Sequence, residues 1–206
     1  MTGTVYLSRD HSGKPGRASG DRGASADLDG SGSIETDERE ANLTPRYLFA
    51  AEMALLEAGH RVIPISDGWY SERARRVNQY AGSFQGPQVY VAAHLNAGWK
   101  GNSGSGYGSI FYDHRSRTGP TLAQYIAKEL RLVAPELSEV KAIAAKPDGW
   151  TRNAYATIGG VVQPVGLCFE PCFIDCAEHA ELLTDSGLTA IWHALAHGIN
   201  RYFATV

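Results

Sequence analysis

Short apolar runs alternate with longer amphipathic segments along most of the chain. The apolar runs predict strands at residues 4–8, 61–65, 88–94, 109–113 and 165–170. Helical periodicity predicts helices over residues 37–58, 71–81, 120–134, 177–183 and 187–203. Strands that alternate with helices are typical of an α/β fold. We therefore expect a single domain over residues 1–206, with a twisted, mostly parallel sheet flanked by helices on both faces.

The start of the first helix has two interpretations. Asp37, followed three residues later by Glu40, resembles a capping box, which would place Pro45 inside the helix. A start at Thr44 would instead place Pro45 at the first helical position, where proline is favoured. The preceding stretch, residues 9–37, is rich in glycine and polar residues, and a loop of that length inside a compact domain is usually functional or disordered.

The composition excludes several classes of protein. The 206 residues are enough for one sizeable domain, and a net charge of −3 does not favour binding to nucleic acid or to an anionic membrane. No apolar run is long enough to span a bilayer, so we expect no membrane insertion. The N-terminus MTGTVYLSRD does not resemble a secretory signal, so we expect synthesis in the cytoplasm. We also expect a monomer.

Some residues with metal-binding side chains are not expected to bind metal. Cys168, Cys172 and Cys176 have a spacing unlike that of zinc fingers, and we expect small buried residues. His193 and His197 are four residues apart on a predicted helix, but no acid accompanies them at the spacing of a zinc peptidase. Three further histidines are expected at the surface: His60, His114 and His179.

Three other candidate side chains lie at or just beyond the ends of predicted strands. His11 follows the first strand, His94 ends the buried strand at 88–94, and Glu170 ends the strand at 165–170. Functional groups of α/β sheets collect at the carboxyl ends of strands. Two histidines and a carboxylate commonly bind catalytic zinc, and a further glutamate can act as general base and acid. Glu170 can fill only one of these roles, so the acidic stretch at 27–40 is the source we expect for the other carboxylate.

Several segments together are similar to a known family: YLSRDHSG, EANLTPRYLFAAEMALLEAGHRV, RARRVN, YVAAHLNAG and VGLCFEPCFIDCAEHAELL. In this order they resemble the zinc-dependent N-acetylmuramoyl-L-alanine amidases of the type 3 family, over nearly the whole chain. The resemblance is nearest to the phage endolysins. It implies a peptidoglycan hydrolase that cleaves the amide between N-acetylmuramic acid and L-alanine, made in the host cytoplasm and acting on the cell wall after release. We see no separate wall-binding domain.

The resemblance also implies roles for individual residues. The zinc histidines of the family fall on His11 and His94, its catalytic glutamate falls on Glu170, and Asn96 is a weaker candidate for substrate binding. The third ligand, counted back from the glycine that ends the first helix, falls on Glu40, with Glu38 as the competitor. This chain departs from the family at residues 8–10, where Ser-Arg-Asp replaces Asp-Pro-Gly, and in a longer insertion at 12–36.

Residues 27–38 also match the register of an EF-hand loop. Asp27, Asp29 and Ser31 occupy positions 1, 3 and 5, the Ser33 carbonyl position 7, and Glu38 position 12, with glycine at position 6. The sequence therefore predicts a calcium site besides the zinc site, and a solvated acidic linker is the alternative. If calcium binds, Glu38 belongs to calcium and Glu40 to zinc.

The activity has two alternatives. A zinc peptidase could cut within the stem peptide, and an inactive wall-binding module stabilised by calcium would use the same fold without catalysis. Aromatic residues in predicted loops could stack on a glycan, or could pack in the core: Trp69, Trp99 and Trp150. Arg152 and Asn153 could bind a carboxylate or a carbonyl of the substrate.

Overall fold

The protein is built on one six-stranded sheet with the strand order β2-β1-β3-β6-β4-β5. The computed structural model describes residues 2–11, 23–28, 31–35, 38–66, 68–98 and 106–206. The strands are β1 (Thr4–Arg9), β2 (Arg61–Ile65), β3 (Gln88–Ala93), β4 (Tyr107–Asp113), β5 (Glu139–Ala145) and β6 (Val165–Glu170). Neighbouring strands are parallel except β4 and β6, which pair antiparallel. The predicted α/β fold with a mostly parallel sheet is confirmed.

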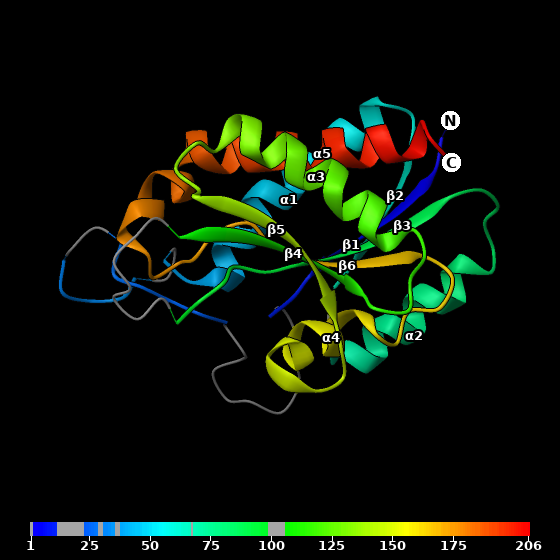
Figure 1. The fold of residues 1–206 in the computed structure, drawn as a ribbon, viewed down its shortest axis with the longest axis horizontal. Coiled ribbons are helices and arrows are strands. Elements are labelled where there is room, and N and C mark those ends of the chain that lie inside the picture. Colours follow the sequence, from blue (N-terminus) through cyan, green and yellow to red (C-terminus); the bar gives the residue numbers. More distant parts are fainter. Residues whose placement is uncertain (1, 12–22, 29–30, 36–37, 67, 99–105) are drawn as a thin grey trace.

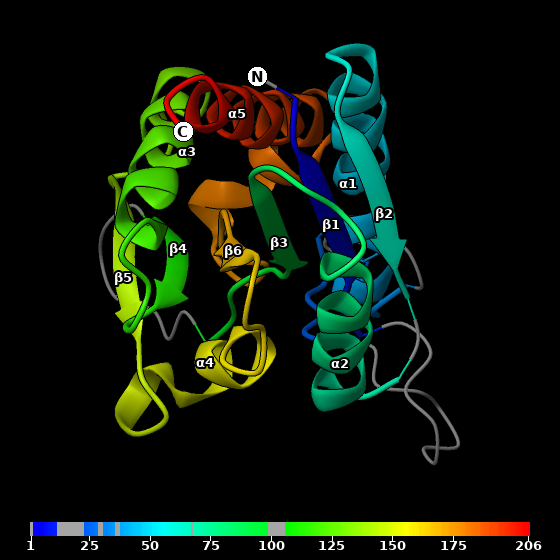
Figure 2. The same ribbon diagram turned by 90° about the vertical axis from the view of Figure 1, so that its right-hand side faces the viewer.

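Helices cover both faces of this sheet (Figures 1 and 2). One face carries α1 (Glu40–Glu57), α3 (Gly119–Val133) and α5 (Asp185–Phe203), and the other carries α2 (Tyr70–Ala81) and α4 (Arg152–Ile158). Two 3-10 helices, η1 (Gly149–Thr151) and η2 (Ala177–Leu183), complete the described elements. Each layer buries its own apolar cluster against the sheet.

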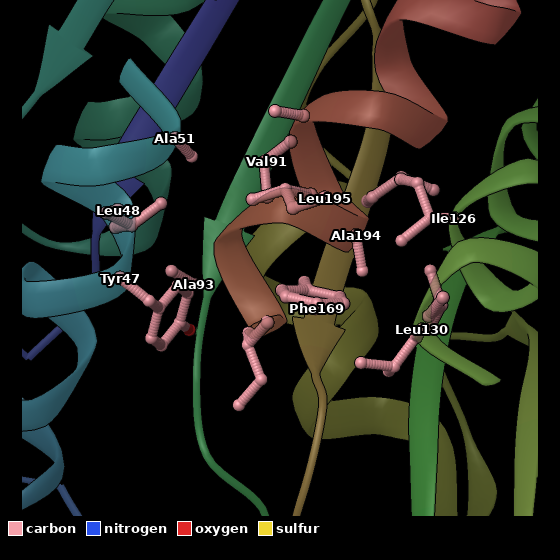
Figure 3. Packing of buried hydrophobic residues seen from close by; sticks show 14 of the residues in the cluster. Tyr47, Leu48, Ala51, Val91, Ala93, Ile126, Leu130, Phe169, Ala194 and Leu195 are labelled. Atoms are coloured by element: carbon pink, nitrogen blue, oxygen red, sulfur yellow. The ribbon is translucent and has the colours of Figure 1, made fainter. Parts of the chain in front are cut away.

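The larger cluster lies between the sheet and the layer of α1, α3 and α5 (Figure 3). Phe169 of β6 lies at its centre, and its ring meets that of Tyr47 edge to face with centroids 6.2 Å apart. Successive side chains of a strand point to opposite faces. Phe169 and Leu167 therefore belong to this cluster, whereas Cys168 belongs to the cluster beneath α2 and α4. The same alternation directs Glu170 toward the α2 and α4 face.

The elements differ from the predictions at four places. The strand β5 and the helix α4 were not predicted, and residues 177–183 form a 3-10 helix. The first helix begins at Glu40, so the predicted start at Thr44 is wrong and Pro45 lies within the helix. Asp37, the predicted cap, lies outside the described residues, and Arg39 occupies the cap position without a side-chain hydrogen bond.

Two of the three histidines expected at the surface are buried. His60 accepts a hydrogen bond from the backbone N–H of Gly3 and contacts Asn200, so it connects the residue just before β1 to α5. The ring of His179 is fully buried and accepts the N–H of Phe173 through Nδ1. The three cysteines are buried as predicted.

Candidate metal centre

Three side chains converge at the carboxyl edge of the sheet. Nε2 of His11 lies 3.0 Å from Nδ1 of His94 and 3.2 Å from Oε1 of Glu40, and the last two atoms are 3.1 Å apart. Among the described residues, this is the group of histidine, cysteine and carboxylate side chains arranged to hold a metal ion. The structure therefore brings together the predicted residues His11, Glu40 and His94.

The pairing of β1 with β3 explains why the two histidines lie close together. β1 and β3 are parallel neighbours in the register Arg9 to Ala93, so the residues that follow them emerge side by side. His11 then turns sharply, with a φ of 66°, a left-handed conformation that is uncommon outside glycine and often marks a functional site. Glu40 approaches from the first turn of α1.

Backbone groups hold the carboxylate of Glu40 in place. Its Oε1 accepts the N–H of Leu95 at 2.9 Å, and its Oε2 accepts the N–H of Ala24 at 2.8 Å. Gly23, with a φ of 71°, permits this approach, because a Cβ there would lie 2.3 Å from Oε2. Burial alone would raise the pKa of Glu40, but hydrogen bonds from His11 and His94 outweigh it and hold the pKa well below its usual range.

Glu38, the competing ligand, points to a different set of partners. Its carboxylate accepts the backbone N–H groups of Leu28 at 2.5 Å and of Glu35 at 2.7 Å. It lies only two positions before Glu40, but α1 begins at Glu40, so Glu38 lies outside the helix. The structure thus directs Glu40 toward the histidines and Glu38 toward the acidic loop.

The three converging atoms suit zinc. Tetrahedral bonds of about 2.0–2.1 Å separate two ligand atoms by roughly 3.3 Å. The observed separations of 3.0, 3.1 and 3.2 Å are close to this value. Two imidazole nitrogens and one carboxylate oxygen are also a donor set of catalytic zinc sites, in which a further position remains open. The residues present therefore fit the predicted zinc ion.

A buried ion pair that was not predicted lies behind His94. Nε2 of His94 is 2.7 Å from Oδ2 of Asp10, and Oδ1 of Asp10 is 3.0 Å from Nη1 of Arg73. Arg73 belongs to α2 and is fully buried. The sequence contains only one hint of this arrangement, an acid directly before His11, because the partner Arg73 is distant in sequence and lies in a helix of strongly polar pattern.

A cavity of about 620 Å³ opens in front of the three side chains. Glu170 lines it together with His11, Glu40 and His94, so all four predicted residues face one space. Burial raises the pKa of Glu170, although the nearby His94 opposes the shift. The thiol of Cys168 donates a hydrogen bond of 3.5 Å to Oε1 of Glu170. A carboxyl group with a raised pKa is suited to accept and release a proton near neutral pH.

Other predicted residues are distributed around this cavity. Asn96, Trp69 and Asn153 line it, and the Oδ1 atom of Asn96 accepts the N–H of Ala97 at 2.9 Å. Arg152 does not line it. Trp150 is exposed and packs against the ring of Phe111, and Trp99 lies outside the described residues.

His193 and His197, which were not expected to bind metal, do not line this cavity and lie on α5. His193 stacks on Trp192 with ring centroids 3.4 Å apart. His197 is exposed, and its Nδ1 lies 3.9 Å from a carboxylate oxygen of Glu129. Neither side chain belongs to the group that converges at the cavity, and His193 is half-buried.

The acidic loop gives no support to the calcium prediction. Asp27 accepts the backbone N–H groups of Ser31 and Gly32, and the Ser31 hydroxyl contacts the Ser33 carbonyl at 3.2 Å. Asp29 lies outside the described residues. In the described part of the loop, no three histidine, cysteine or carboxylate ligand atoms converge. Calcium binding stays a prediction.

Sequence comparison finds no matching family model and no matching curated protein. Solved structures do match. An N-acetylmuramoyl-L-alanine amidase from Clostridium difficile 630 superposes with a TM-score of 0.76 at 16% identity, over 99% of this chain and 98% of that one. This chain has the fold of such an amidase. The catalytic domain of the amidase CwlV from Bacillus (Paenibacillus) polymyxa var. colistinus gives a TM-score of 0.72 at 16% identity, over the whole of both chains.

The endolysins are also represented among the matches. The catalytic domain of an endolysin targeting Clostridia difficile gives a TM-score of 0.57 at 17% identity, over 95% of this chain and 97% of that one. The resemblance seen in the sequence is therefore confirmed at the level of the fold. Among the described residues, no helix combines the length and the apolar character needed to cross a membrane.

Proposed function

We propose that the protein is a zinc-dependent N-acetylmuramoyl-L-alanine amidase, which hydrolyses the amide between the lactyl group of N-acetylmuramic acid and L-alanine in peptidoglycan. The observation that carries the proposal is the convergence of His11, Glu40 and His94 in a cavity that Glu170 also lines. The fold shared with solved amidases supports the choice of substrate.

His11, Glu40 and His94 would hold the zinc ion through Nε2, Oε1 and Nδ1, the atoms that converge. Zinc with three protein ligands lowers the pKa of a water molecule at its open position and polarises a carbonyl group. Glu40 suits this role because its low pKa keeps the carboxylate ionised, and the N–H groups of Leu95 and Ala24 fix its orientation.

Glu170 would act as general base and then as general acid. Its side chain faces the cavity, and its raised pKa favours taking a proton from the attacking water. The same carboxyl group then gives that proton to the nitrogen of the departing L-alanine. The carboxyl group of Glu170, unlike that of Glu40, is not among the converging ligand atoms, so it remains available for proton transfer.

Digestion of purified peptidoglycan tests this proposal. Zinc-loaded protein should release stem peptides with a free L-alanine amino terminus, detected by amino-terminal labelling and mass spectrometry. Glu170→Gln should still bind zinc and lose this release, whereas Glu57→Gln, at an exposed position of α1, should keep it. Release by Glu170→Gln at the wild-type rate would contradict the assigned role.

The same digest distinguishes the alternatives. A peptidase would release fragments that begin at a later residue of the stem peptide, and a binding module would release none. We further propose, following the sequence resemblance, that the enzyme acts as an endolysin after synthesis in the host cytoplasm. Protein added to permeabilised bacteria should lower the turbidity of the suspension, and Glu170→Gln should not.

A further inference from the structure

The two nitrogens of the His94 ring face different partners. Nδ1 points toward His11 and Glu40, at 3.0 and 3.1 Å, whereas Nε2 points away from them toward Oδ2 of Asp10 at 2.7 Å. His94 is buried, and the Asp10 side chain is fully buried. The imidazole therefore bridges the candidate metal position and a carboxylate that does not reach that position itself.

Asp10 is held in place by a second set of contacts. Its Oδ1 accepts hydrogen bonds from the hydroxyl of Ser8 at 2.5 Å and from Nη1 of Arg73 at 3.0 Å. Arg73 is in turn fixed by the backbone carbonyls of Arg9, at 2.7 Å from Nη1, and Gly68, at 3.0 Å from Nε. Ser8, Asp10 and Arg73 are all buried. The carboxylate thus has a fixed position and a buried cation beside it.

We propose that Asp10 is a positioning residue that holds His94 in the orientation and tautomer needed to bind a metal ion through Nδ1. A carboxylate only accepts hydrogen bonds, so the Nε2 atom that faces Asp10 carries the proton. In the metal-free protein Nδ1 also carries a proton, which faces Glu40. A metal ion bound at Nδ1 would displace that proton, while the proton that Asp10 accepts would stay on Nε2 of the neutral ring. Carboxylates in this position fix the ring and make it a stronger ligand, and their loss lowers metal affinity by about 10–100-fold.

The inference rests on the proposed metal site, but zinc affinity can be measured without peptidoglycan. Metal-free full-length protein is titrated with zinc against a chromophoric chelator, comparing wild type with Asp10→Asn and Asp10→Ala. Asp113→Asn is the matched control, because Asp113 is also a buried aspartate paired with an arginine, Arg115, and does not line the metal cavity. Both Asp10 variants should bind zinc about 10–100-fold more weakly, and the control should bind like wild type.

A measurement on the wild-type protein keeps the test decisive if an Asp10 variant fails to fold. In the zinc-loaded protein, nitrogen-15 NMR of the histidine side chains should show His94 protonated at Nε2 and bound to metal through Nδ1. Metal bound at Nε2, or unchanged zinc affinity in folded Asp10 variants, would overturn the positioning role and leave the amidase proposal intact. Failure of the wild-type protein to bind zinc would contradict the inference and the proposed metal site together.

Discussion

The buried guanidinium of Arg73 provides a quantitative test of how the site is supported. Arg73 is the largest fully buried side chain among the described residues, and it donates to Asp10, Ser8 and two backbone carbonyls. Replacement with methionine keeps much of the volume and removes the charge. The Asp10 carboxylate, which is fully buried, then loses its arginine partner.

The expected loss of stability follows from these contacts. Breaking a buried ion pair by removing one partner destabilises a protein by about 3–5 kcal/mol. His94 compensates in part: burial lowers its pKa, but Asp10 and Glu40 outweigh burial and raise the pKa to about 10, so a second cation faces Asp10 in the metal-free protein at neutral pH. We therefore expect the lower end of the range, about 3 kcal/mol. At about 2–4 °C per kcal/mol, the melting temperature should fall by roughly 6–12 °C.

Thermal and urea unfolding of the metal-free protein measure this loss. Arg75→Met is the control, because Arg75 is exposed on the same helix and its side chain donates a hydrogen bond of 3.4 Å to the exposed Gln79. This variant should change stability by no more than about 0.5 kcal/mol. The double variant Arg73→Met with Asp10→Asn should lose less than the sum of the single variants, with a coupling of about 0.5–3 kcal/mol. An Arg73→Met protein as stable as Arg75→Met would refute the reasoning.

Three further predictions concern the cavity, the metal and the core. Burial raises the pKa of Glu170, so the metal-free wild type should lose stability as the pH rises from the pKa of the unfolded chain, near 4.3, through the higher pKa of the folded protein. Glu170→Gln should therefore melt at a higher temperature than wild type at pH 8 and at the same temperature at pH 4. Equal melting temperatures at both pH values would contradict this prediction. Zinc at a thousand times its dissociation constant should stabilise the metal-free protein by about 4 kcal/mol, and His94→Ala should abolish the shift in melting temperature; a shift retained by the variant would exclude His94 as a ligand. A Cβ at Gly198 would lie 2.6 Å from the Cα of Ile126, so Gly198→Ala should lose about 1–3 kcal/mol of unfolding free energy, measured with urea. Gly82→Ala is the control, because the nearest atom to a Cβ there is 3.9 Å away. An equal loss in the control would refute the packing argument.

The sequence predicts most of the sheet because its central strands are buried on both faces and appear as continuous apolar runs. The edge strand β5 pairs only with β4, and its sequence EVKAIAA includes charged residues that an edge position tolerates, so no apolar run marks it. The helix α4 was missed as well, since its 7 residues are too few to show a clear period.

The candidate site, like the fold, could be predicted from the sequence only in part. His11, His94 and Glu170 can be found from sequence because each follows an apolar strand, and parallel pairing brings strand ends together. The choice between Glu38 and Glu40 depends on where α1 begins, and helix boundaries are the least reliable part of a sequence-based prediction. Asp10 could not be assigned a role, because its ion pair with Arg73 exists only once α2 packs against the sheet.

The central claim, that one particular amide bond is hydrolysed, is tested most directly by isotope incorporation. An N-acetylmuramoyl peptide is digested by the zinc-loaded protein in water enriched in oxygen-18, and both products are examined by mass spectrometry. Cleavage of the amide to L-alanine places one oxygen-18 atom in the lactyl carboxylate of the sugar and none in the intact peptide, which is the result we predict. Oxygen-18 in a carboxylate within the stem peptide, with the lactyl amide unbroken, would contradict the account.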